Sequence, residues 1–260
     1  MLVEDTAKLI LELVDDVEIA NWLIGVKYSI SIAMKHNTVE AGIAIVPIED
    51  IYSMGMVRKP PLKENLVDMV SSFNILEKSL GVSALNALSQ YLLWVKEYVK
   101  DYKVEYKKSL LDIINDIESR RDDLIVVVGN MVPLVRKLEE KKYNVLVFER
   151  NPALRLKGSL PDCLEYRALR EADIVIVTGA TLVNDTIDLV LNTTRKAYTR
   201  ILVGPTASIY PELFLRRGFT FVAGTRIIDP YKAIDIIRLG GGRWDLDPLF
   251  KSYIVYSDKD

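Results

Sequence analysis

Hydrophobic residues in the second half of the chain form short, unbroken runs instead of alternating with polar residues. Such runs are typical of strands that are covered on both faces, as in a parallel sheet. They occupy residues 124–128, 145–148, 174–177, 201–203 and 219–222. Segments with helical spacing separate them, at residues 132–142, 164–172, 182–197, 211–217 and 231–239. This alternation predicts an α/β fold with a doubly wound, Rossmann-like parallel sheet.

The first half of the chain has a different pattern. An acidic amphipathic helix is predicted at residues 4–16. Two later runs, at residues 23–34 and 39–48, alternate between apolar and polar positions and predict strands. His36 and Asn37 lie in the polar gap between these runs, so we expect a hairpin turn there.

Two further segments suggest where the chain divides. A long helix is expected at residues 82–100, and the charged segment at 100–123 is interpreted as a helix that leads from one unit to the next. We therefore expect a smaller α+β domain at residues 1–119. A Rossmann-like ligand-binding domain would follow at residues 120–260.

The overall composition excludes several classes of protein. Half of the residues are hydrophobic and 27% are charged, as in an ordinary globular chain. The 34 basic residues are nearly balanced by 36 acidic ones, so no positive field favours nucleic acid as a partner. No apolar stretch reaches the roughly 18 residues of a membrane span. The first residues are acidic where a secretory signal is basic, so we expect a cytoplasmic protein.

The chain has one cysteine, Cys163, and one histidine, His36. A lone cysteine excludes an internal disulfide and fits a reducing compartment. A lone histidine excludes the catalytic zinc sites that use two or three imidazoles, and it disfavours Ser-His chemistry. A homodimer is expected only because many soluble proteins form one, and no residue pattern of this chain indicates it.

Small and polar residues follow every predicted strand of the second half. In an open parallel sheet the carboxyl ends of the strands meet at one edge, where ligands bind. Any single turn of this kind is explained by the needs of a tight turn, but five together favour a ligand-binding crevice. The candidate residues are Gly129, Asn130, Met131, Pro133, Glu149, Asn151, Pro152, Gly179, Thr181, Asn184, Gly204, Pro205, Thr206, Gly224 and Thr225.

Glu149 supports a sharper hypothesis. It ends the second strand, 20 residues after Gly129, where dinucleotide-binding folds place the acid that holds ribose hydroxyls. The turn at Gly129 lacks the G-x-G-x-x-G pattern, so an NAD pyrophosphate site is not supported. Two interpretations of Glu149 therefore stay open. It binds a nucleoside-type ligand, or it is a solvated carboxylate that pairs with Arg150 or Arg155.

Three other polar residues have both a structural and a functional interpretation. Asn86 lies among apolar and small residues, and it is either a hydrogen-bonded core amide or a group that reaches into the crevice. Asp162 stands three residues before Glu165, which resembles a capping box. Asp229 precedes Pro230 and is expected to cap a helix. Asp162 and Asp229, with Glu149, are weak candidates for metal ligands.

Several segments together resemble the putative heavy-metal chelation family, formerly a family of unknown function. The matching segments are residues 81–88, 128–135, 149–152, 160–162, 178–186, 203–211 and 223–230. Each motif is weak alone, but jointly they are specific and extend from about residue 24 to 242. The resemblance implies an N-terminal domain like that of enolases, a Rossmann-like domain and a site between them. It implies no established reaction.

The implied metal must be compared with the donors that the chain offers. Soft heavy metals prefer thiolate and imidazole, whereas Glu149, Asp162 and Asp229 suit harder ions. Alternatively, the metal arrives bound to a chelating small molecule such as a tetrapyrrole. Three functions therefore stay open: a small-molecule site that serves metal handling or metal-cofactor assembly, a transferase with a cofactor such as S-adenosylmethionine, and a non-catalytic binding protein. No catalytic residue is assigned, so whether the protein is an enzyme is left open.

Overall fold

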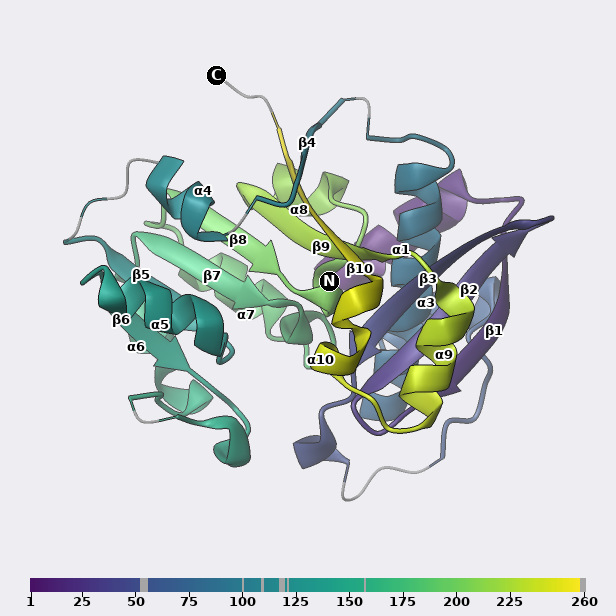
Figure 1. Cartoon of the computed structure of the whole chain (residues 1–260), viewed down its shortest axis with the longest axis horizontal. Coiled ribbons are helices and arrows are strands. Elements are labelled where there is room, and N and C mark those ends of the chain that lie inside the picture. The colour runs from purple at the N-terminus through teal and green to yellow at the C-terminus, as the bar shows by residue number, and fades with distance from the viewer. Residues whose placement is uncertain are drawn as a thin grey trace.

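The chain contains two β-sheets that lie side by side (Figure 1). The structure is a computed structural model that describes residues 1–51, 56–99, 101–108, 110–116, 120, 122–156 and 158–257. One sheet has three antiparallel strands and the other has seven strands, most of them parallel. Among the described residues, no helix has the length and apolar character that crossing a membrane requires.

The large sheet has the strand order β4-β10-β9-β8-β7-β5-β6. Its parallel strands are β5 (Leu124–Val128), β6 (Asn144–Phe148), β7 (Ile174–Thr178), β8 (Thr199–Val203) and β9 (Phe221–Ile227). Two antiparallel strands, β10 (Phe250–Tyr256) and β4 (Lys103–Tyr106), extend one edge. The chain runs outward from β5 to β6 and then crosses back to β7, so the strand order reverses between β5 and β7. This confirms the doubly wound α/β fold and all five predicted parallel strands.

Helices cover both faces of the large sheet, which explains why its central strands β5 and β7 are almost entirely apolar. Ile125 and Val127 face α4 (Leu110–Asp116) and α5 (Val132–Glu140). Val126 and Val128 face the opposite side. The helices on that side are α6 (Glu165–Leu169), α7 (Ile187–Thr193) and α8 (Glu212–Arg216). Side chains at both even and odd positions are therefore buried.

The small sheet consists of β1 (Glu18–Ile24), β2 (Tyr28–Lys35) and β3 (Thr38–Ile45). The predicted turn at residues 36 and 37 is confirmed, because Lys35 pairs with Thr38 across it. The predicted single strand at 23–34 is wrong. The chain turns at Gly25, whose N–H donates to the carbonyl of Tyr28 at 2.9 Å, and β1 and β2 lie on either side of that turn.

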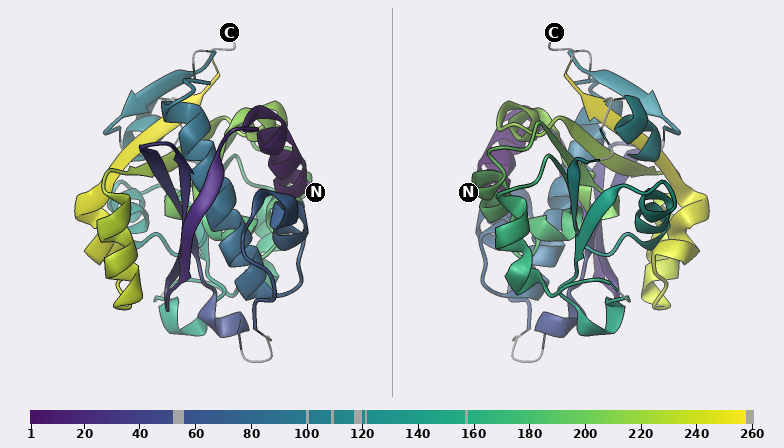
Figure 2. Two further views of the ribbon diagram at one scale, coloured as in Figure 1. Left: turned by 90° about the vertical axis from the view of Figure 1, so that its right-hand side faces the viewer. Right: turned by 90° about the vertical axis from the view of Figure 1, so that its left-hand side faces the viewer.

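The long helix α3 (Ile75–Trp94) packs on one face of the small sheet (Figure 2), and its Gln90 side chain donates to the hydroxyl of Tyr253 on β10 and to the carbonyl of Ser208 in the loop after β8. It is buried on every side from Lys78 to Leu93, whereas α1 (Leu2–Leu13) and α2 (Lys63–Val70) bury one face each. Small residues let α3 approach β3 closely: a Cβ atom on Gly42 would lie 2.1 Å from the backbone nitrogen of Ala87. Helix α3 therefore belongs to the core of the N-terminal unit, by which we mean the small sheet with α1, α2 and α3, and also to the core of the unit built on the large sheet.

The N-terminal and C-terminal halves also contribute elements to each other. Helices α9 (Pro230–Arg238) and α10 (Arg243–Leu246) pack on the second face of the small sheet. Strand β4 joins the large sheet, so the predicted helix at residues 100–123 is wrong over that strand. The domain boundary between residues 119 and 120 stays a prediction.

Candidate functional site

The loops that follow the parallel strands gather at one edge of the large sheet, which we call the rim (residues 129–131, 149–155, 179–186 and 204–208). Gly129 follows β5 at the point where the strand order reverses. Its φ of +95° is in the left-handed region, and a Cβ atom there would lie 2.6 Å from Cγ2 of Thr178. Glycine is needed here because the ends of β5 and β7 approach closely.

The carboxylate of Glu149 ties two rim loops together. One oxygen accepts the N–H of Asn130 at 2.8 Å, and the other accepts the N–H of Asn151 at 2.9 Å. The side chain of Asn130 in turn donates to the carbonyl of Leu154 at 2.7 Å. Glu149 is therefore fixed at the rim by backbone amides rather than by Arg150 or Arg155, and each of its oxygens keeps capacity for a further donor.

Arg155 is held at the rim by two backbone carbonyls. Its Nε donates to the carbonyl of Glu149 at 2.7 Å, and its Nη2 donates to that of Arg150 at 2.9 Å. Within the described part of the chain no carboxylate pairs with it, so its charge is not neutralised. From the amino-acid sequence, Arg155 is expected only as a partner for Glu149, because hydrogen bonds to backbone carbonyls leave no pattern of residues.

The loops after β7 and β8 are covered by the N-terminal unit. Asn86 on α3 donates to the carbonyls of Ile43 and Thr206, both at 2.9 Å. The hydroxyl of Thr206 accepts the N–H of Ile45 at 2.9 Å. Asn86 is thus a buried amide at the contact between the units, although its carbonyl oxygen is buried without a partner.

Gly179 and Thr181 lie in the same covered region. A Cβ atom on Gly179 would lie 2.4 Å from the backbone nitrogen of Ala207, so the loops after β7 and β8 pack backbone against backbone. Thr181 is buried and donates to the carbonyl of Thr178 at 2.7 Å. Asn184, farther along, accepts from the hydroxyl of Thr186 at 2.8 Å. Gly179 and Thr181 support the rim from within and are not accessible to a ligand.

The remaining candidates are half-buried or exposed. Gly204 has a φ of +111° and no atom within 4 Å of its Cβ direction, so open space lies beside it. Pro205 and Met131 are half-buried at the starts of η5 (Pro205–Ala207) and α5, and Pro133 and Pro152 are exposed. Accessible rim positions thus cluster at the loops after β5, β6 and β8.

Gly224 and Thr225 do not follow their strand. The predicted loop position is wrong because β9 continues to Ile227, so both residues lie inside the sheet. A Cβ atom on Gly224 would lie 2.5 Å from the hydroxyl of Tyr253 on β10. Thr225 donates its N–H to the hydroxyl of Ser208 at 2.9 Å. An antiparallel neighbour that the sequence analysis missed explains the extra length of β9.

A seam joins the N-terminal unit to the loop after β6. The short 3₁₀ helix η1 (Ile48–Asp50) supplies Asp50, which pairs with Arg150 at 3.0 Å. It also supplies Glu49, which accepts from the side chain of Asn151 at 3.2 Å. One oxygen of Asp50 is buried without a partner. These two acids escaped the sequence analysis because their partners lie about a hundred residues away.

Glu165 is a buried carboxyl close to this seam. Only 5% of the residue is exposed, and one carboxyl oxygen is buried without a partner. Burial, and then the charge of Asp162, raise the pKa of Glu165 to about 7, while Arg150 opposes the shift. Asp162 accepts the N–H of Cys163 at 3.0 Å, and no side chain caps α6, so the predicted capping box is wrong.

Replacing Glu165 with glutamine should change how stability depends on pH. Because burial raises the pKa of Glu165 to about 7, the folded state holds a proton that the unfolded state loses at lower pH. The native protein therefore loses stability as pH rises from about 5 through 7. We expect Glu165→Gln to gain about 2 kcal/mol relative to the native protein between pH 5 and pH 8. Urea unfolding at both pH values measures the free energy of unfolding of each protein. If the difference between the variant and the native protein is the same at pH 5 and pH 8, the prediction is contradicted.

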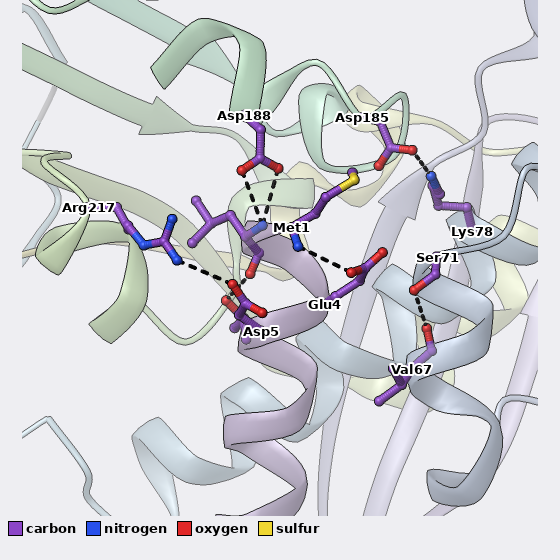
Figure 3. Close-up of polar contacts among 11 residues, drawn as sticks. Met1, Glu4, Asp5, Val67, Ser71, Lys78, Asp185, Asp188 and Arg217 are labelled. Atoms are coloured by element: carbon purple, nitrogen blue, oxygen red, sulfur yellow. Dashed lines mark hydrogen bonds and ion pairs between the residues drawn. The ribbon is translucent and has the colours of Figure 1, made fainter. Parts of the chain in front are cut away.

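Another polar contact between the units lies beside the start of the chain (Figure 3). Lys78 on α3 is 3% exposed and forms an ion pair with Asp185 in the loop after β7. Asp185 has a φ of +62° and a second carboxylate oxygen that is buried without a partner. Nearby, the N–H of Leu2 donates to Asp188 at the start of α7 at 3.2 Å. The first contact fastens the rim loop 179–186 to the N-terminal unit, and the second fastens the adjoining helix α7 to it.

The three weak metal candidates do not come together as a metal site. Glu149 binds two backbone amides, Asp162 accepts the N–H of Cys163, and Asp229 caps α9 by accepting the N–H of Lys232 at 3.0 Å. Across the described ranges, no three His, Cys, Asp or Glu side chains are placed to hold one ion. Cys163 is exposed. The side chains that the structure describes therefore do not fit a bare heavy-metal ion.

Comparison with known proteins places the chain in a family. Residues 112–256 match the family DUF364, and residues 7–89 match DUF4213; both are described as "Putative heavy-metal chelation". An uncharacterised protein of Methanocaldococcus jannaschii is 36% identical over 258 residues, which is 97% of this chain and 95% of that protein.

Two solved structures are similar over nearly the whole chain, and both are proteins of unknown function from DUF364. The Pyrococcus horikoshii protein has a TM-score of 0.87 at 29% identity, covering 98% of this chain and 100% of that one. The Desulfitobacterium hafniense protein has a TM-score of 0.75 at 20% identity and shows the same fold, with 98% of both chains covered. The chain described here therefore belongs to the DUF364 family, whose description is putative heavy-metal chelation.

Proposed function

We propose that this protein binds a metal ion carried by an anionic organic chelator, at the accessible part of the rim, in metal handling or metal-cofactor assembly. The observation that carries the proposal is the unneutralised charge of Arg155, which two backbone carbonyls hold in place. A guanidinium fixed in this way is prepared to bind carboxylate or phosphate groups without a further loss of conformational freedom.

The chain's own donors favour a chelated metal over a bare ion. The sequence contains one thiol and one imidazole, whereas soft metals require several such donors. A metal that brings its own ligands needs only a surface that recognises those ligands. Chelators such as polycarboxylates and tetrapyrroles carry acidic groups, so recognition by a cation follows from their chemistry.

Two backbone features of the rim support an anionic ligand. Helix α5 begins at Val132, directly after Met131, and points its positive end toward the rim. Gly204 leaves open space farther along the rim, at the loop after β8. Glu149 supports this surface by holding the loops after β5 and β6 in position.

Calorimetric titration with a defined chelate tests the proposal. We expect the Ni²⁺–EDTA complex, an inert dianion, to bind more tightly than free Ni²⁺. Arg155→Ala should weaken binding of the complex at least about tenfold, the usual contribution of a charge-assisted hydrogen bond. Arg216→Ala, which removes an exposed arginine paired with Glu212 on α8, is the matched control. Equal binding by the native protein and Arg155→Ala would overturn the proposal.

A nucleoside cofactor is the second candidate, and the geometry of Glu149 favours it. Each oxygen of this carboxylate binds one backbone amide and can accept another hydrogen bond, such as one from a ribose hydroxyl. Its place at the end of β6, next to the reversal of strand order, is where dinucleotide-binding folds hold ribose. Titration with S-adenosylmethionine separates the two functions. Binding that Glu149→Gln abolishes and Arg155→Ala leaves unchanged would favour the nucleoside.

A further inference from the structure

A hollow of about 630 Å³ lies between α6 and α7, away from the rim. Each of these helices leads back to the amino end of the next strand, β7 or β8, so their last turns lie at the opposite edge of the large sheet. Tyr166 on α6, with Arg170 and Glu171 just after it, forms one wall. Leu189 and Asn192 on α7, with Arg195 and Lys196 just after it, form the other. The volume is in the range of small-molecule sites.

Two of the cations that line the hollow have no acidic partner. Lys196 pairs at 2.5 Å with Glu171, which also lines the hollow, whereas Arg170 and Arg195 have no carboxylate partner among the described residues. Arg167 is likewise unpaired there, and it lines a smaller hollow of about 330 Å³ that shares Arg170 and Tyr166 with the first. Because the chain as a whole has a slight excess of acidic residues, three free guanidinium groups in one place constitute a local anion-binding surface.

The same walls offer an aromatic surface and a polar amide. Half of Tyr166 is exposed, and the guanidinium carbon of Arg170 lies 6.0 Å from the centre of its ring. Leu189 is 46% exposed on the facing helix. A planar ring can stack on tyrosine and arginine while an attached anionic group binds the guanidinium groups. Asn192 adds donors and an acceptor for the edge of such a ring.

We infer that this hollow binds a phosphorylated ligand that carries a flat ring, of the nucleoside monophosphate class. The phosphate is bound by Arg170 and Arg195, and the ring stacks on Tyr166. The bounded volume and the acidic composition of the whole chain favour a small ligand over a long nucleic acid. This site lies at the edge opposite the rim and is independent of the function proposed there.

Titration with adenosine monophosphate, adenosine and inorganic phosphate tests the inference. We expect the nucleotide to bind more tightly than either part alone. Arg195→Ala should weaken binding of the nucleotide and of phosphate at least about tenfold. Tyr166→Leu should weaken the nucleotide by about tenfold and leave phosphate unchanged, because only the nucleotide has a ring to stack. Both side chains are exposed, so the variants are expected to fold, and circular dichroism checks this.

Two controls locate the ligand. Arg216→Ala removes an exposed arginine of α8 outside the hollow and should leave binding unchanged. Glu149→Gln should also leave nucleotide binding unchanged, because Glu149 is at the rim. The inference is overturned if the nucleotide does not bind, or if binding persists in Arg195→Ala. It is also overturned if Glu149→Gln removes binding, since the nucleotide would then occupy the rim.

Discussion

Replacing Gly42 with alanine is expected to destabilise the protein by at least about 3 kcal/mol, the upper end of the cost of overpacking a core. A Cβ atom there would lie 2.1 Å from the nitrogen of Ala87, 2.4 Å from the oxygen of Ser83 and 2.5 Å from the carbonyl carbon of Asn86. All three are backbone atoms of α3, so no side chain can rotate away. The helix as a whole must move off β3.

That displacement would reach the rim, because α3 holds it through Asn86. The hydrogen bonds from Asn86 to Ile43 and Thr206, both 2.9 Å, require α3 to lie against β3. Urea unfolding followed by circular dichroism measures the loss. Gly240→Ala is the control, since its φ of +84° costs about 1 kcal/mol but no atom lies within 4 Å of the new Cβ. Equal losses in the two variants would contradict this explanation.

Replacing Lys78 with methionine is expected to cost about 3 kcal/mol, the low end of the range for breaking a buried ion pair. The lysine side chain is 3% exposed and that of Asp185 is 32% exposed, so water compensates part of the loss at the aspartate. What remains is a half-buried carboxylate without a cation. Its other oxygen is already buried without a partner.

The double variant Lys78→Met, Asp185→Asn separates the ion pair from packing. Asparagine tolerates the left-handed backbone at residue 185, where φ is +62°, and carries no charge. We expect it to recover most of the stability that Lys78→Met loses, because the unpaired charge is gone. Thermal unfolding of the native protein, the two single variants and the double variant gives the energetic coupling between Lys78 and Asp185. If the double variant is no more stable than Lys78→Met, the unpaired charge of Asp185 is not what destabilises Lys78→Met.

Strands buried on both faces were predictable because their pattern does not depend on their neighbours. The runs at 124–128 and 174–177 contain only apolar residues and coincide with β5 and with most of β7. Strands at or near an edge were not predictable in this way. β1 has exposed residues at Glu18 and Asn21 together with a bulge, and β10 exposes Lys251 and Ser252. Such mixed patterns of polar and apolar residues can be interpreted as strands only when the neighbouring strand is known.

The candidate site was predictable where it follows from topology. Gly129 and Glu149 follow two adjacent parallel strands, β5 and β6, so their loops leave the sheet side by side at the same edge. Arg155 was not predictable as a site residue, because it binds backbone carbonyls, which any sequence supplies. Asp50 was missed because its contact with Arg150 depends on how the two units pack.

Anomalous diffraction from crystals soaked in the Ni²⁺–EDTA complex tests the proposed rim site most directly. The anomalous signal locates the metal without assumptions about the ligand. A nickel peak beside Arg155 and the start of α5, absent from crystals of Arg155→Ala, is the predicted result. A peak at the exposed thiol of Cys163 or at His36 in the hairpin turn, with none at the rim, would contradict it.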